Sequence, residues 1–109
     1  MIGYRSKLIL DRKDEIVEVL LSRLKEHDWP ISYGELGKAL HLGARSPWKV
    51  VLDAIRGDCD RKREADITCA LYRWNTGYPS KADWLKAERP DEAQVKVADE
   101  VILRLQLIY

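Results

Sequence analysis

The residues of this sequence best suited to catalysis or metal binding are two cysteines, Cys59 and Cys69, and two histidines, His27 and His41. Two cysteines are too few for a disulfide framework or for a zinc site of their own, and the sequence contains neither C-x-x-C nor H-E-x-x-H. A nucleophilic cysteine needs a histidine, a cation or a helix N-terminus beside it, and the sequence places none next to Cys69. We therefore expect no catalysis, no metal and no cofactor.

A second group of chemically informative residues lies in the segment ARSPWKVVLDAIR, residues 44–56. Val50, Val51, Ala54 and Ile55 recur at helical spacing and predict a buried stripe. Arginine and lysine side chains suit phosphates and guanine edges, so the opposite face is a candidate nucleic-acid surface. That face is expected to carry Arg45, Trp48, Lys49, Asp53 and Arg56, with Ser46 at its leading end.

This face has to be positioned by two helices. In the first, Ser32 and Glu35 have the S-x-x-E spacing of a capping box, which predicts a helix that starts at Tyr33 and ends near His41. Gly43 is expected to take the positive φ of the turn that follows.

The second helix is expected to have Ser46 as its N-cap and Pro47 in its first position, and to stop at Gly57. A tight turn between the two helices gives a helix-turn-helix over about residues 32–57. In that arrangement the leading end of the second helix meets base edges in a groove of the duplex. The sequence therefore predicts double-stranded DNA as the partner.

A strand and a turn are predicted after this pair of helices. Residues 67–74, ITCALYRW, are rich in β-branched and aromatic residues, and Asn75-Thr76-Gly77 has turn chemistry. A return strand at Tyr78-Pro79 would complete a β wing over about residues 67–79. Tyr72 and Arg73 would then lie near its tip, where they could contact sugar-phosphate or simply pack.

The flanking segments are predicted to be mostly helical. Residues 1–10 alternate loosely and are interpreted as a short strand or a loose arm. An amphipathic helix of about four turns follows Asp11 as its cap and ends near His27. A short helix is expected after Ser80, and a final helix opens at Asp91 and Glu92. The fold class expected is mainly α (α+β), a single winged helix-turn-helix domain over residues 1–109 with helices on both flanks.

Composition limits the function. The 109 residues are 46% hydrophobic and 34% charged, which is typical of a globular domain, and the formal net charge is +1. Nucleic-acid affinity must therefore come from a local patch, because no global basic field exists. No apolar run approaches the roughly 20 residues of a membrane span, and the first residues do not look like a signal peptide. We expect a cytoplasmic protein with no membrane partner.

Two of these motifs also carry a family resemblance. The sequence YGELGKAL at residues 33–40 and the pair Ala44-Arg45 are similar to motifs of the O6-alkylguanine-DNA alkyltransferases and their inactive alkyltransferase-like relatives. The resemblance covers about residues 31–77 and implies a winged-helix DNA-binding domain. It also implies that Tyr33 presses on a target phosphate and that Arg45 fills the gap left by a flipped base.

The chain departs from that family at the reactive cysteine. Cys69 stands in Thr-Cys-Ala-Leu, where the family has Pro-Cys-His-Arg, and the span from Arg45 to Cys69 is longer than the family's. Cys69 is therefore interpreted as a core residue of a non-catalytic DNA-binding module. Two alternatives stay open: a Cys69-dependent enzyme acting on damaged bases, and a protein-interaction module on the same scaffold. The interaction module is favoured by the low net charge, by Asp53 and by the apolar C-terminal helix, which could bind a protein partner or a second copy.

Overall fold

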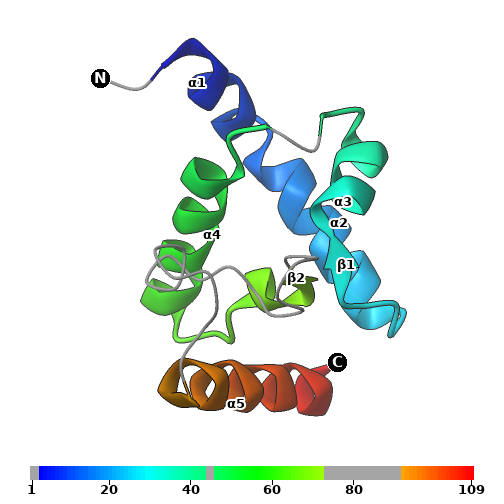
Figure 1. Cartoon of the computed structure of the whole chain (residues 1–109), viewed down its shortest axis with the longest axis vertical. Helices are drawn as coiled ribbons and strands as arrows, with labels where there is room; N and C mark the ends of the chain where they lie inside the picture. The colour runs from blue at the N-terminus through cyan, green and yellow to red at the C-terminus, as the bar shows by residue number, and fades with distance from the viewer. Residues whose placement is uncertain (1–2, 44–45, 73–91) are drawn as a thin grey trace.

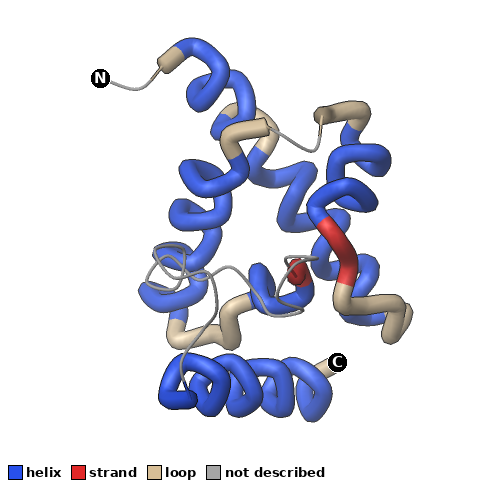
Figure 2. The backbone as a smooth tube through the Cα atoms, viewed as in Figure 1, coloured by secondary structure: helices blue, strands red, loops and turns tan. Residues whose placement is uncertain are grey.

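The chain is mainly helical and carries one small sheet in the computed structural model, which describes residues 3–43, 46–72 and 92–109. Figure 1 shows α2 between α3 and α4 in the body of the molecule, with α5 running across one end. The two strands are short, as Figure 2 shows. In chain order the elements are α1 (Tyr4–Leu10), α2 (Lys13–Lys25), β1 (Ile31–Ser32), α3 (Tyr33–Leu40), α4 (Trp48–Lys62), the 3-10 helix η1 (Ile67–Ala70), β2 (Leu71–Tyr72) and α5 (Glu92–Ile108).

The core forms around η1, which contacts α2, α4 and α5. The other main contacts join α1 to α4 and α2 to α3. One apolar face of each helix enters this core, because burying such faces is the main source of helix stability in a small domain. The fully buried side chains include Ile16, Leu20 and Leu24 of α2, Leu36 of α3, Val51 and Ile55 of α4, and Leu105 of α5.

The sheet differs from the predicted wing. β1 and β2 are parallel, with Ile31 opposite Leu71 and Ser32 opposite Tyr72. Only residues 71–72 of the predicted strand 67–74 are extended among those described, and residues 67–70 form one turn of 3-10 helix instead. Asp66 explains the difference, because its carboxylate accepts from the backbone N–H of Thr68 at 3.0 Å and from its hydroxyl at 2.5 Å. The rest of the predicted wing, residues 73–79, and the helix predicted after Ser80 lie outside the described residues.

The N-terminal prediction was wrong. Residues 4–10 form α1, which packs on α4 and buries Ile9, so a tertiary contact decides the conformation of this segment. Asp11 ends α1 rather than capping the next helix, since its backbone N–H donates to the carbonyl of Lys7 at 3.0 Å. The predicted amphipathic helix is present as α2, and the predicted final helix is present as α5.

The predicted N-cap and start of α3 are confirmed. The Ser32 hydroxyl accepts from the backbone N–H of Glu35 at 3.2 Å, and the helix begins at Tyr33. Its end differs from the prediction, because His41 rather than Gly43 takes the left-handed conformation, with φ 56°. The backbone N–H of Leu42 then donates to the carbonyl of Gly37 at 2.7 Å, which closes the helix end.

The helix α4 is longer than predicted. It continues through Gly57 and ends at Lys62, where Arg63 takes a left-handed conformation. Ile55 and Cys59 are buried on either side of Gly57 along the helix, so core packing carries the helix past a residue that only weakens it locally.

Two glycine substitutions test the end of α3 and the continuation of α4 through Gly57. A Cβ at Gly37 would lie 2.5 Å from the carbonyl oxygen of Leu42, whereas a Cβ at Gly57 would meet nothing closer than 3.7 Å. Gly37→Ala should lower the free energy of unfolding by more than about 1 kcal/mol, because a buried clash must be relieved. Gly57→Ala should raise it by about 0.5–1 kcal/mol, because alanine is the better helix former. Urea unfolding measures both, and equal effects of the two substitutions would contradict this structure of the α3 end.

Candidate nucleic-acid interface

The connection between α3 and α4 leads into the predicted reading helix. Ser46 does not cap that helix, since its hydroxyl donates to the carbonyl of Gly43 at 2.7 Å. The helix instead begins at Trp48, whose backbone N–H donates to the carbonyl of Ser46 at 2.7 Å, and its N-cap residue Pro47 makes no side-chain capping hydrogen bond. Its first turn also contains no carboxylate. The leading end of α4 therefore carries the positive end of the helix dipole, with no carboxylate in its first turn.

Trp48 was predicted to face outward, and this was wrong. Its side chain is only 7% exposed, and its ring lies 6.2 Å from that of Tyr33, the half-buried first residue of α3. The reason is that the apolar stripe of α4 lies on a different side of the helix from the predicted one. The buried residues of α4 are Trp48, Val51, Leu52, Ile55 and Cys59, so the stripe is rotated from the predicted one. Val50 and Ala54 are only half-buried.

Arg56 also lies inside the molecule, which corrects its predicted place on the reading face. Its side chain is 12% exposed. The guanidinium Nε donates to the hydroxyl of Thr68 at 2.9 Å and lies 3.7 Å from the carboxylate of Asp66, while Nη1 donates to Asp53 at 3.1 Å. Arginine presents several donors in a rigid fork, so one side chain can join α4 to η1. Arg56 is therefore a structural residue.

Asp66 and Thr68 were missed at the sequence level as partners of this arginine. The available signal was Asp66-x-Thr68, a pattern in which a carboxylate caps a turn two residues on. It was overlooked because the strand predicted over residues 67–74 includes Thr68 but begins after Asp66.

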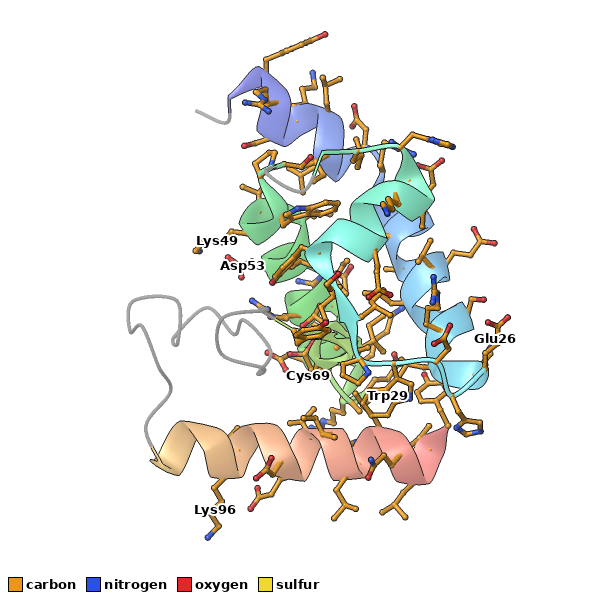
Figure 3. All side chains as sticks on the ribbon, turned by 45° about the vertical axis from the view of Figure 1, so that its right-hand side comes forward. Glu26, Trp29, Lys49, Asp53, Cys69 and Lys96 are labelled. Atoms are coloured by element: carbon orange, nitrogen blue, oxygen red, sulfur yellow. The ribbon has the colours of Figure 1, made fainter. Side chains whose placement is uncertain are left out.

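Among the described residues, Lys49 is a predicted contact residue that lies on the surface. Its side chain is 62% exposed, and its ammonium lies 2.8 Å from the carboxylate of Asp53, one turn along the helix. Figure 3 shows both side chains on the outer side of α4. An exposed pair of this kind is weak and can exchange for another anion.

The other predicted contact residues divide into two groups. Tyr72 is half-buried in β2, where it lines a cavity together with Cys69. It was predicted to lie near the tip of an exposed wing. Arg45 and Arg73 lie outside the described residues. The structure therefore brings together Tyr33, Ser46, Trp48 and Lys49 at the leading end of α4.

Basic residues at the other end of α4 are accompanied by acids. Arg61, Lys62 and Arg63 are exposed, but Arg61 pairs with Asp58, which also accepts from Lys13 of α2 at 2.8 Å. The hydrogen bond from Lys13 is the main cause of a lowered pKa of the Asp58 carboxyl. Asp58 therefore offsets part of the positive charge of Lys13, Arg61 and Lys62 at this end.

The two cysteines lie in the core. Cys69 is 1% exposed in η1, and Cys59 is buried in α4, where desolvation raises the pKa of its thiol. A raised pKa opposes the thiolate form that a nucleophile or a metal ligand needs. Within residues 3–43, 46–72 and 92–109, no cluster of histidine, cysteine and carboxylate groups is suited to a metal ion. None of the described helices combines the length and apolar character that crossing a membrane requires.

Comparisons with known proteins give no assignment. No protein-family model matches this chain, and neither a curated protein nor a solved structure matches it.

Three alanine substitutions on α4 separate interior residues from the surface. Trp48→Ala should lower the free energy of unfolding by about 3–5 kcal/mol, as expected for removal of a buried aromatic side chain. Arg56→Ala should lower it by roughly 3 kcal/mol, because it leaves Asp66 without its cation. Lys49→Ala serves as the matched surface control and should change it by less than about 0.5 kcal/mol. Chemical denaturation measures all three, and a neutral Arg56→Ala would place that side chain back on the surface.

Proposed function

We propose that this chain is a non-catalytic double-stranded DNA-binding module that docks the leading end of α4 on the duplex. The observation that carries the proposal is the chemistry of that helix end. Its N-cap residue Pro47 supplies no side-chain acceptor, its first turn lacks a carboxylate, and Lys49 extends from it into solvent. Helix N-termini of this kind bind phosphate, because the backbone donors and the helix dipole both favour an anion.

The neighbouring residues support the same surface. The Ser46 hydroxyl precedes the helix, and Tyr33 lies at the start of α3 in contact with Trp48. The resemblance to the winged-helix domain of the alkyltransferases adds Tyr33 as a phosphate contact and Arg45 as a residue that enters the duplex. The proposed winged helix-turn-helix would also bring Arg73 to the DNA from the segment after β2.

The burial of two predicted contact residues reduces the surface proposed to contact DNA. Trp48 and Arg56 no longer belong to the reading surface, so fewer groups remain to read bases, and phosphate contacts should dominate the affinity. The non-catalytic part is supported by the burial of Cys69. We also propose a cytoplasmic location, which suits the two free, buried thiols of Cys59 and Cys69.

Two substitutions at one ion pair should move DNA affinity in opposite directions. Lys49→Gln should weaken binding and make the salt dependence shallower by about one unit of log–log slope, because one phosphate contact is lost. Asp53→Asn should tighten binding, because it removes the anion that competes with phosphate for Lys49 and keeps an oxygen for Arg56. Fluorescence anisotropy with a short duplex at about 50 mM and about 200 mM salt measures both effects.

Lys96→Gln is the matched control, because this exposed lysine lies on α5 and away from α4 (Figure 3). It should leave affinity and salt slope unchanged. An unchanged slope in Lys49→Gln would remove the leading end of α4 as the contact surface.

A protein-interaction module is the second candidate, favoured by the apolar side chains that α5 exposes. Val97, Leu103, Leu107 and Ile108 are each about half exposed or more, with Leu107 at 79%. Such residues on one helix are typical of a surface that a protein partner or a second copy covers. This function predicts no duplex binding even at low salt, together with self-association or partner binding that is insensitive to salt.

A further inference from the structure

A cavity separate from α4's leading end lies between the α2–β1 connection, the η1–β2 segment and the C-terminal half of α5. Its volume is about 280 Å³. The walls come from His27 and Trp29 of the connection, from Cys69 and Tyr72, and from Ile102 and Gln106 of α5. In Figure 3, Trp29 and Cys69 both lie on the side of the core that faces α5.

The lining selects a planar ligand. Three of the walls are aromatic side chains: the imidazole of His27, the indole of Trp29 and the phenol of Tyr72. Aromatic faces stack best on another flat ring, and the volume is near the lower limit for pockets that hold small organic molecules. A molecule of one or two fused rings is therefore the size and shape that the cavity admits.

The lining also selects a neutral ligand. Among the described residues that form the walls, none is a carboxylate, a lysine or an arginine. The described walls therefore offer a charged ligand no carboxylate, ammonium or guanidinium partner. Gln106 contributes a carboxamide, which carries both donors and an acceptor and so matches a cyclic amide edge. We propose that this cavity binds a small, neutral, planar heteroaromatic molecule that bears a lactam-like edge.

Occupancy would also strengthen the attachment of α5. Leu105 is the fully buried residue of this helix among those whose side chains are described, and Ile102 and Gln106 flank it along the sequence. A ligand between Gln106 and Trp29 would bridge α5 to the α2–β1 connection. Ligand that binds only the folded chain raises the unfolding temperature by mass action. This site is independent of DNA binding, because none of its walls belongs to α4.

The probe for this site is quinazolin-4-one, a neutral fused heterocycle with a lactam edge. Proton–nitrogen correlation NMR of the full chain follows the indole N–H of Trp29 and the side-chain amide of Gln106 during titration. Both signals should shift, and the unfolding temperature should rise with probe concentration. The control probe is δ-valerolactam, which keeps the lactam edge but has no aromatic face, and it should bind at least about tenfold more weakly.

Variants of α5 locate the binding site. Gln106→Trp places a ring in the cavity and should abolish binding, and Gln106→Leu keeps the space but removes the carboxamide, so it should weaken binding about tenfold. Leu107→Trp introduces the same ring at the next, strongly exposed position and should bind the probe like the parent chain. The proposal is overturned if δ-valerolactam binds equally well, if the Trp29 and Gln106 signals do not shift, or if Gln106→Leu binds as tightly as the parent.

Discussion

The described structure depends on how one largely buried cation, Arg56, is held between α4 and η1. Asp53 holds the guanidinium from its own helix, while Asp66 and Thr68 hold it from η1. Asp66 also caps the turn that contains Thr68, so the same carboxylate shapes η1 and holds it on α4. A buried cation of this kind is tolerated only where its donors are matched by acceptors, which makes the arrangement specific.

The position of η1 sets the positions of its neighbours. η1 contacts α2, α4 and α5, and it leads directly into β2, which pairs with β1 at the start of α3. The ion-pair network therefore fixes the segment through which α3, α4 and α5 are related. It also removes Arg56 from any external surface and leaves the outward face of α4 to Lys49 near its leading end.

The sequence was most informative where a local interaction decides the structure. The Ser32–Glu35 capping box gave the start of α3, and strong apolar periodicity gave α2 and α5. The sequence was misleading where tertiary packing decides the conformation of a segment. Ile67 to Ala70 has strand propensity, but the Asp66 cap and burial on three sides turn it into η1. Gly57 reads as a helix stop, but Ile55 and Cys59 hold the helix on the core.

Tertiary packing also explains why the buried face of α4 was predicted incorrectly at the candidate site. A stripe phase based on Val50 and Ala54 puts Trp48 and Arg56 outside, whereas the actual stripe of Trp48, Val51, Leu52, Ile55 and Cys59 puts both in the interior. The two phases differ by roughly a quarter turn about the helix axis. The α4 sequence alone does not distinguish them, because either stripe is apolar. The partners that decide between them, Tyr33 on α3 and Thr68 on η1, come from other elements.

The most direct test of the proposed division of α4 is a proton–nitrogen correlation NMR titration of the chain with a short DNA duplex. If the leading end of α4 docks on DNA while Arg56 stays inside, the backbone signals of Ser46, Trp48 and Lys49 should shift together. The side-chain Nε–H signal of Arg56 should keep its position, because Thr68 continues to accept from it. Shifts confined to α5, or a large displacement of the Arg56 signal with none at Lys49, would contradict this assignment of the two faces.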